Sequence, residues 1–199
     1  MDNLGILLAG GHSSRMGQDK ALLPYADHTL AEHIYRIMKK RLPQVWVSRQ
    51  KDQPVPFNAD RIVCDEERDK GPLSGIFSVL QAALESGQYD GLLIVPVDLP
   101  CLTEDTLMPL LQEGRRLQRP VCYGQHYMPL YLPVRSEIAD EISRQLHTPD
   151  SRLSVASIFY QFHGLQLAEP RDLSLTNTNT MAEWQAAQQR IEQHEVPDG

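Results

Sequence analysis

The sequence predicts an α/β fold, a three-layer, doubly wound and mostly parallel sheet with an antiparallel hairpin in the C-terminal half. Three observations predict it. Short apolar runs alternate with amphipathic stretches of helical spacing, which is typical of β-α units around a parallel sheet. The first apolar run ends in a glycine-rich turn at Gly10-Gly11. Two later apolar runs lie close together on either side of 124–126, which indicates a hairpin and not another β-α unit.

In the N-terminal half, short apolar runs and amphipathic stretches predict strands and helices in turn. The expected strands are 4–8, 45–48, 61–64 and 92–97. The fourth is the most continuously apolar, so we place it in the centre of the sheet, covered on both faces. Thr29 and Glu32 form a capping box that predicts a helix over 29–42. Inward-facing apolar residues predict a second helix over 74–84, which Gly87 ends.

The C-terminal half is expected to contribute a hairpin and four helices. Thr103, followed by two acidic residues, predicts a helix start, because acids suit the positive end of the helix dipole. Thr180 and Glu183 form a second capping box, which opens the final helix. The hairpin strands are expected at 121–123 and 128–132, and the two remaining helices at 136–146 and 153–159.

Composition and charge exclude several classes of protein. With 199 residues, 41% hydrophobic and 23% charged, the chain has the composition of a single globular domain, 1–199. A net charge of -7 gives no electrostatic footprint for nucleic acid. The longest strongly apolar stretch, 91–97, is far shorter than the ~20 residues that span a bilayer, so no membrane partner is expected. Cys64, Cys101 and Cys122 have neither disulfide nor zinc-ligand spacing, which favours a reduced, cytoplasmic location.

The segment 8–24, with the sequence LAGGHSSRMGQDKALLP, follows the first strand directly. Gly10 and Gly11 permit positive φ and close approach of a ligand to the backbone, whose successive N–H groups can hold an anion. Arg15 can bind phosphate oxygens through two hydrogen bonds, and Lys20 adds a point charge. Each residue alone could belong to a tight turn with solvated cations. Together, at the carboxyl end of a strand, they indicate a phosphate site.

Two carboxylates are expected at the same edge of the sheet. Asp98 ends the most buried strand, and Pro100 stops that strand from continuing. A single carboxylate there suits Mg²⁺, which binds one or two carboxylates together with phosphate oxygens and water. The alternative is a cap for the helix that begins near Thr103. Asp65 follows the third strand but also begins a run of charged residues, and such runs are usually solvated.

These segments resemble the molybdenum cofactor guanylyltransferase family, a branch of the nucleotidyltransferases that share the loop L-A-[AG]-G-x-S-x-R-M-G-x-x-K. The resemblance also covers 71–75, 96–100 and 177–180, in the family's order and over nearly the whole chain. It implies a Rossmann-like nucleotidyltransferase fold and transfer of GMP from MgGTP to the terminal phosphate of molybdopterin, with release of pyrophosphate. Mg²⁺ is the implied cofactor. Other cofactor-biosynthesis proteins and apo-molybdoenzymes are the implied transient partners.

The resemblance also implies roles for individual residues. Arg15, Lys20 and Asp98 would be catalytic, with Asp98 as the metal ligand. An acceptor-binding region, from about residue 104 to 199, would hold the pterin through Asn177 and Asn179, beside the loop residues His126 and Tyr127. A nucleotide-binding region, from about residue 1 to 103, would hold the nucleotide through Leu8, Ala9, Gly10, Gly11, Arg15, Lys20, Ser48, Asp65 and Asp98.

The base preference depends on two features of the sequence that point in different directions. The family commonly has an asparagine after the second strand, where this chain has the shorter Ser48. The L-A-G-G form of the loop favours guanine, whereas related cytidylyltransferases usually have L-A-A-G. Two alternatives therefore stay open, a CTP-dependent or other small-phosphate nucleotidyltransferase and a non-enzymatic nucleotide- or pterin-binding module. The joint presence of Arg15, Lys20 and Asp98 argues against the module, because binding alone needs no such set of charges at the α-phosphate.

Overall fold

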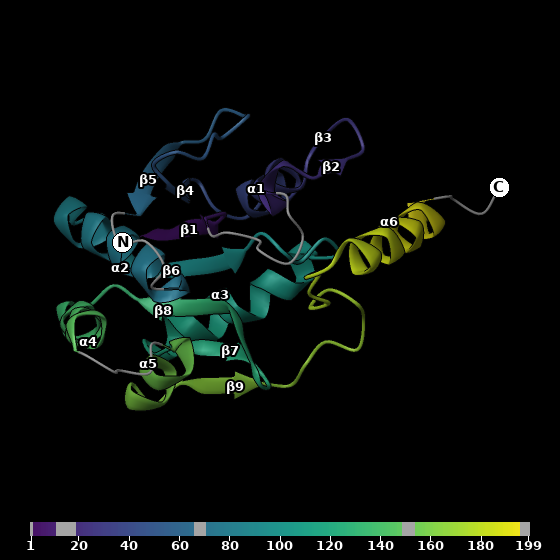
Figure 1. Ribbon diagram of the computed structural model, residues 1–199. Coiled ribbons are helices and arrows are strands. Elements are labelled where there is room, and N and C mark those ends of the chain that lie inside the picture. The colour runs from purple at the N-terminus through teal and green to yellow at the C-terminus, as the bar shows by residue number, and fades with distance from the viewer. Residues whose placement is uncertain (1, 11–18, 66–70, 149–153, 196–199) are drawn as a thin grey trace.

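The structure is a computed structural model that describes residues 2–10, 19–65, 71–148 and 154–195, with side chains up to residue 189. Its centre is a seven-stranded sheet with the order β5-β4-β1-β6-β8-β7-β9 (Figure 1). β8 pairs antiparallel with both of its neighbours, and the other pairs are parallel. The mostly parallel sheet with a C-terminal hairpin is therefore confirmed. Its strands are β1 (Asp2–Leu8), β4 (Val45–Gln50), β5 (Arg61–Asp65), β6 (Tyr89–Pro96), β7 (Val121–Tyr123), β8 (His126–Pro133) and β9 (Leu165–Leu167).

Helices cover both faces of this sheet, which makes the three layers that the sequence predicts. On one face, Leu7 and Val95 belong to a core shared with α1 and α3, and on the other, Ile6 and Ile94 belong to a core shared with α2, α4 and α5. β6 supplies fully buried side chains to both cores because successive residues of a strand face opposite sides. No helix in the described part of the chain is long and apolar enough to cross a membrane. The helices are α1 (Leu30–Lys39), α2 (Pro72–Ser86), α3 (Glu104–Leu117), α4 (Ser136–His147), α5 (Val155–Gln161) and α6 (Met181–Glu195).

Local signals set the ends of these helices as the sequence predicts. Thr29 Oγ1 accepts a hydrogen bond of 3.3 Å from the backbone N–H of Glu32 at the start of α1. Thr180 Oγ1 accepts the equivalent bond, 3.2 Å, from Glu183 at the start of α6. Gly87 ends α2 in the left-handed region, with φ 62°. The capping box of α6 is complete, because Glu183 Oε2 also accepts the backbone N–H of Thr180, and the glycine stop of α2 is confirmed. At α1 the N-cap is confirmed, but Glu32 Oε1 accepts a hydrogen bond from Arg36, so among the described residues only the Thr29 half of the predicted box forms.

Several short elements are absent from the sequence prediction. They are the two-stranded ribbon β2 (Pro24–Tyr25) and β3 (His28–Thr29), the 3-10 turn η1 (Lys20–Leu22), and β9. Each is two or three residues long, so it is too short to show a hydrophobic period. β7 is equally short and was predicted because it forms a hairpin with the longer apolar run of β8. Residue 153, the predicted start of the fifth helix, lies outside the described residues. Ser154 is the N-cap of that helix.

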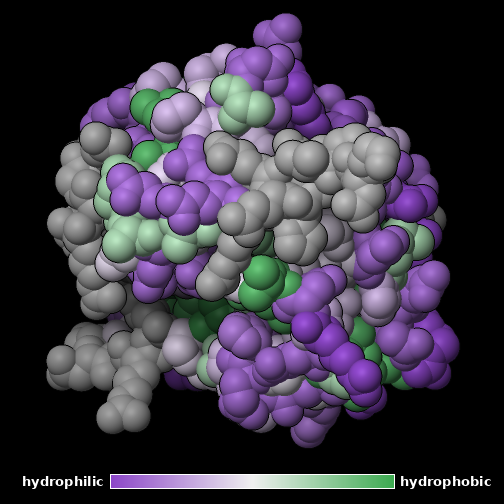
Figure 2. Space-filling model, turned by 90° about the vertical axis from the view of Figure 1, so that its right-hand side faces the viewer, coloured by the Kyte–Doolittle hydropathy of each residue, from purple (hydrophilic) through white to green (hydrophobic). Residues whose placement is uncertain are grey.

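The order of the strands creates one switch point. From β1 the chain continues to β4 and β5 on one side, and then returns through α2 to β6 on the other side of β1. In open α/β sheets, ligands bind outside the carboxyl ends of the strands at such a point. β6 points toward the side of the molecule on which α6 lies (Figure 1). Figure 2 turns this side to the viewer and shows a mostly hydrophilic face with hydrophobic residues in a recess near its centre.

Candidate active site

Lys20 and Asp98 lie together at this switch point. Lys20 is the first residue of η1, and its Nζ lies 3.6 Å from Asp98 Oδ2. The same Nζ donates a hydrogen bond of 2.8 Å to Asn179 Oδ1. The side chains of Lys20 and Asp98 are only 13% and 20% exposed. The fold thus brings a cation, a carboxylate and an amide from three distant segments of the sequence into one partly shielded cluster.

Asp98 is not a helix cap. β6 ends at Pro96, so Asp98 lies just beyond the strand and not at its last position, which corrects the prediction. α3 begins at Glu104 with Thr103 as its N-cap, and Thr103 Oγ1 lies 2.9 Å from Thr106 Oγ1. The alternative role of Asp98 at the start of this helix is therefore excluded. The Asp98 carboxylate therefore belongs to the candidate site and not to a helix cap.

Burial raises the pKa of the Asp98 carboxyl above its usual range, and the nearby Lys20 charge and Asn177 side chain oppose this shift. Asp98 Oδ1 is buried and has no hydrogen-bond partner among the described residues. A desolvated carboxylate oxygen without a partner fits a bound cation. Mg²⁺ needs only one or two carboxylates because phosphate oxygens and water complete its shell. The described residues contain no cluster of three or more His, Cys, Asp or Glu, so they offer no all-protein metal site.

The segment around Thr178 is attached directly to Asp98. The backbone N–H of Thr178 donates to the Asp98 carbonyl oxygen at 3.0 Å, and its hydroxyl donates to the same oxygen at 3.4 Å. The two predicted acceptor residues on either side, Asn177 and Asn179, face the Asp98 carboxyl and the Lys20 ammonium group respectively. Glu183 of α6 fixes this segment, because its Oε2 accepts a hydrogen bond of 2.7 Å from the backbone N–H of Asn179.

A second group of predicted residues lies at the ends of the neighbouring strands. Leu8 of β1 is paired in register with Ser48 of β4. Ser48 is 2% exposed, and its Oγ lies 2.8 Å from the position that a Cβ would take at Gly75. Asp65 ends β5 and accepts a hydrogen bond from the hydroxyl of Ser74 in the first turn of α2. Gly75 therefore lets α2 approach the sheet so closely that the Ser48 side chain is covered.

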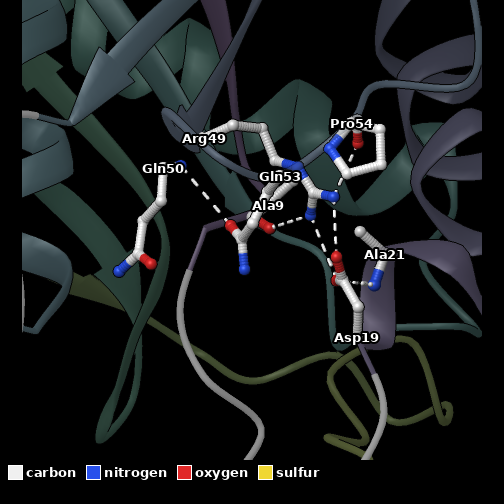
Figure 3. A network of polar contacts seen from close by, with 7 residues as sticks. All are labelled: Ala9, Asp19, Ala21, Arg49, Gln50, Gln53 and Pro54. Carbon is white, nitrogen blue, oxygen red and sulfur yellow. Dashed lines mark hydrogen bonds and ion pairs between the residues drawn. The ribbon is translucent and has the colours of Figure 1, made fainter.

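Arg49 has a place in the site that the sequence reasoning missed. Its side chain is 1% exposed and makes two hydrogen bonds to Asp19, from Nη1 to Oδ1 at 3.1 Å and from Nη2 to Oδ2 at 2.7 Å (Figure 3). Nη1 also donates to the carbonyl oxygen of Ala9 at 2.6 Å. An arginine directly after the strand segment Val45-Trp46-Val47-Ser48 was the available signal, since a buried cation needs an acidic partner.

A sequence model of the MobA-like NTP transferase domain matches residues 5–159 of this chain. The chain belongs to that family. This MobA-like chain is 31% identical over 196 residues to the probable molybdenum cofactor guanylyltransferase of Mycobacterium avium, covering 95% of this chain and 96% of the relative. It is 33% identical over 184 residues to the molybdenum cofactor guanylyltransferase of Pseudomonas aeruginosa, with 88% and 89% covered. The resemblance seen in the sequence is therefore confirmed, and the chain is a nucleotidyltransferase.

Solved structures confirm the fold of this MobA-like chain. The molybdopterin-guanine dinucleotide biosynthesis protein A of Archaeoglobus fulgidus superposes with a TM-score of 0.76 at 17% identity, covering 96% of this chain and 99% of that one. A CMP:2-keto-3-deoxy-manno-octonic acid synthetase complexed with CTP gives 0.69 at 13% identity, with 98% and 100% covered. At these identities the likeness concerns the fold alone. It shows the predicted Rossmann-like nucleotidyltransferase architecture.

The glycine-rich loop contains three further predicted site residues, Gly10, Gly11 and Arg15. Gly10 does not have a positive φ, so it does not use the backbone freedom that the sequence suggested. A Cβ at Gly10 would lie 3.4 Å from the backbone nitrogen of Gln50, at the limit of ordinary contact. Gly11 and Arg15 lie outside the described residues, so their predicted roles stay predictions.

The hairpin residues His126 and Tyr127 start β8 at the edge of the sheet where β6 ends, because the two strands are antiparallel. His126 Nε2 lies 3.7 Å from Glu169 Oε1. The hydroxyl of Tyr127 donates to that of Tyr160 at 2.9 Å. Both side chains thus have protein partners, and their assignment to the acceptor pocket stays a prediction.

Proposed function

We propose that this chain transfers GMP from GTP to the terminal phosphate of molybdopterin, releasing pyrophosphate. The observation that carries the proposal is the cluster of Lys20, Asp98 and Asn179 at the switch point of a MobA-like fold. Relatives named molybdenum cofactor guanylyltransferase, 31% and 33% identical over most of the chain, support guanine and the pterin as substrates.

The residues act by alignment and charge neutralisation. The acceptor phosphate is already ionised at neutral pH, so the reaction needs no strong general base. Lys20 stabilises the charge that develops on the α-phosphate, and the position of its Nζ beside Asp98 and Asn179 supports this role. Arg15 and the backbone N–H groups of the loop bind the leaving β- and γ-phosphates. Holding acceptor, phosphorus and leaving group in line supplies the rest of the rate enhancement.

Asp98 is the residue that would hold Mg²⁺. Its Oδ1 has no hydrogen-bond partner among the described residues, while Oδ2 faces Lys20. When bound, Mg²⁺ supplies Lewis-acid polarisation of the α-phosphate. The bonds from Thr178 to the Asp98 carbonyl oxygen fix the backbone from which this carboxylate projects.

In this proposal the two substrates meet at the cluster of Lys20, Asp98 and Asn179. The acceptor contacts Asn177 and Asn179, in the acceptor-binding region (residues 104–199). The nucleotide lies on the nucleotide-binding region (residues 1–103), at Leu8, Ala9, Gly10, Gly11, Arg15, Lys20, Ser48, Asp65 and Asp98.

We place the reaction in the cytoplasm, with other cofactor-biosynthesis proteins and apo-molybdoenzymes as transient partners.

The test is a nucleotide panel. Calorimetric titration of GTP, CTP, ATP and UTP in the presence of Mg²⁺ is expected to give GTP the tightest binding, at least ~10-fold over CTP, or about 1.4 kcal/mol. Pyrophosphate release is expected only when molybdopterin is added. Equal binding of the two nucleotides, or preference for CTP, would assign the chain to a cytidylyl reaction. Binding of GTP without pyrophosphate release on molybdopterin would contradict the proposed transfer.

A further inference from the structure

The guanidinium group of Arg49 is the centre of a buried polar network (Figure 3). Besides its bonds to Asp19 and to the Ala9 carbonyl oxygen, its Nη2 donates to the carbonyl oxygen of Pro54 at 2.6 Å. Ala9 lies at the end of β1, and Asp19 directly precedes η1. One side chain of β4 therefore connects the end of the first strand to the beginning of the turn that carries Lys20.

Asp19 connects Arg49 to the turn that carries Lys20. Its Oδ1 accepts a hydrogen bond of 3.0 Å from the backbone N–H of Ala21, which makes Asp19 the N-cap of η1. The Asp19 carboxylate thus accepts hydrogen bonds from both terminal nitrogens of Arg49 and from one backbone N–H of η1. Lys20 stands between Asp19 and Ala21, and its ammonium group reaches Asp98 and Asn179.

The turn cannot fix its own position. η1 has three residues, and 3-10 turns of this length have few and poorly aligned hydrogen bonds. The Arg49–Asp19 pair, in contrast, is bidentate, with an arginine that is 1% exposed. A lysine in place of this arginine would keep the charge but lose the fork that contacts both carboxylate oxygens.

We propose that Arg49 and Asp19 are positioning residues for the nucleotidyl transfer, which hold η1 so that Lys20 Nζ faces Asp98 and Asn179. The inference rests on the proposed function for its kinetic consequence. The contacts that carry it do not depend on the identity of the nucleotide. Among the described residues neither has a hydrogen bond or ion pair with Asp98, and the bonds of Asp19 to Arg49 and to the Ala21 N–H connect both to the turn that carries Lys20.

A double-mutant cycle tests whether they act through Lys20. Arg49→Met is expected to lower kcat at least ~10-fold with a smaller change in KM for GTP. In a Lys20→Ala background, the same substitution is expected to change kcat less than ~2-fold, because the group that it positions is already gone. Arg49→Lys is expected to restore little of the lost kcat. An equal loss of kcat from Arg49→Met in both backgrounds would overturn the proposal, as would full activity of Arg49→Lys.

Two further variants separate positioning from general destabilisation. Ile142→Ala removes a fully buried side chain of α4 in the core on the α2 side of the sheet, and is expected to lower the thermal midpoint while leaving kcat unchanged below it. Asp19→Asn keeps an oxygen for the Ala21 N–H but loses the charge, so it is a milder probe if Arg49→Met does not fold. It is expected to lower kcat, and unchanged kcat in Asp19→Asn would overturn the proposal.

Amide hydrogen exchange separates this inference from the proposed function, because it needs no substrate. Exchange at the Ala21 and Leu22 amides, which donate to Asp19 Oδ1 and to the Asp19 carbonyl oxygen, is expected to be at least ~10-fold faster in Arg49→Met than in the wild-type chain. If the wild-type chain released no pyrophosphate from GTP and molybdopterin, the proposed function would fail and this measurement would decide the positioning role alone. Unchanged exchange at both amides would overturn it.

Discussion

The carboxyl group of Asp98 is in an environment that disfavours its own charge. Burial raises its pKa, and its Oδ1 has no hydrogen-bond partner among the described residues. The folded chain therefore gains no stability from the ionised form of this residue, whose charge becomes favourable when a cation shares the site. Such an environment is typical of a residue retained for chemistry and not for stability.

Asp98→Asn is expected to lower pyrophosphate release on the order of 10³-fold, since an amide is a poor ligand for Mg²⁺ and several kcal/mol of transition-state stabilisation are lost. The thermal midpoint is expected to stay the same or rise. The sign follows from the raised pKa, because the folded state disfavours the charge that the substitution removes. Both quantities are measured on the same preparation. A normal rate with a lowered midpoint would contradict the metal assignment.

Lys20→Ala is expected to lower kcat more than it weakens GTP binding, because the charge on the α-phosphate oxygens is greatest in the transition state. Steady-state kinetics give kcat, and calorimetry gives the dissociation constant of GTP. A variant with unchanged turnover would refute the role of Lys20, whatever happens to binding.

Residues of the site differ in how far the sequence could reveal them. Lys20, Asp98 and Asn179 belong to motifs, and the structure brings them together. Arg49 could not be assigned a role, because its partners come from Ala9, Asp19 and Pro54 and only the fold makes them neighbours. The burial of Ser48 depends likewise on how closely α2 approaches the sheet.

At the scale of elements, the two capping boxes have different relations to the site. At the start of α1, Thr29 caps the N–H of Glu32, and among the described residues neither side chain has a hydrogen bond to Asp98 or Asn179. In the box at the start of α6, Glu183 Oε2 accepts the backbone N–H groups of Asn179 at 2.7 Å and of Thr180 at 2.9 Å. The second box therefore fixes a helix and a site residue at once.

Glu183→Ala and Thr29→Ala form a matched pair. Thr29→Ala is expected to lower the free energy of unfolding by about 0.5–2 kcal/mol through loss of an N-cap side chain. Glu183→Ala is expected to lower it as well, through loss of the bonds that its carboxylate accepts from Asn179 and Thr180. Only Glu183→Ala is expected to lower the rate of pyrophosphate release, by several-fold, because it releases the backbone of Asn179. Urea denaturation and a rate assay on both variants decide the matter. Equal rates in the two variants would mean that the α6 cap plays no role in the site.

The length of a helix or strand decides whether the sequence alone can specify it. The long helices and strands were predicted because they carry caps or a hydrophobic period over many residues. The ribbon of β2 and β3, the turn η1 and strand β9 lie below that length, and their pairing partners set them. η1, which carries Lys20, is one of them, so the position of this lysine comes from tertiary contacts.

At the scale of the whole molecule, an aromatic stack joins the ribbon, α1 and α6. Tyr25 of β2 stacks on His33 of α1 with ring centroids 3.7 Å apart, and Trp184 of α6 lies 6.3 Å from Tyr25. Burial, followed by the charge of His28, lowers the pKa of His33 from 6.5 to about 4. The stack therefore requires a neutral imidazole.

The free energy of unfolding is expected to fall as the pH drops from 6.5 toward 4. The unfolded chain binds a proton at His33 throughout this range, whereas the folded chain binds it only near the lower limit. The shift corresponds to a loss of at most about 3 kcal/mol. Urea denaturation between pH 7.5 and 4.5 measures it, with His33→Gln as the control. An equally steep fall in the His33→Gln variant would show that other groups cause it.

The hydrogen bond between Lys20 and Asn179 joins residues 159 positions apart. A ribosome makes the chain from its first residue onward, so β1, α1 and α2 exist long before the segment that holds Lys20 and Asp98 in place. A nascent chain that ends between residues 98 and 177 has the cation and the carboxylate but neither the Thr178 bonds nor the Asn179 amide. Synthesis itself therefore delays the completed site, and the chain cannot act on a nucleotide with its full set of contacts until this late segment has emerged.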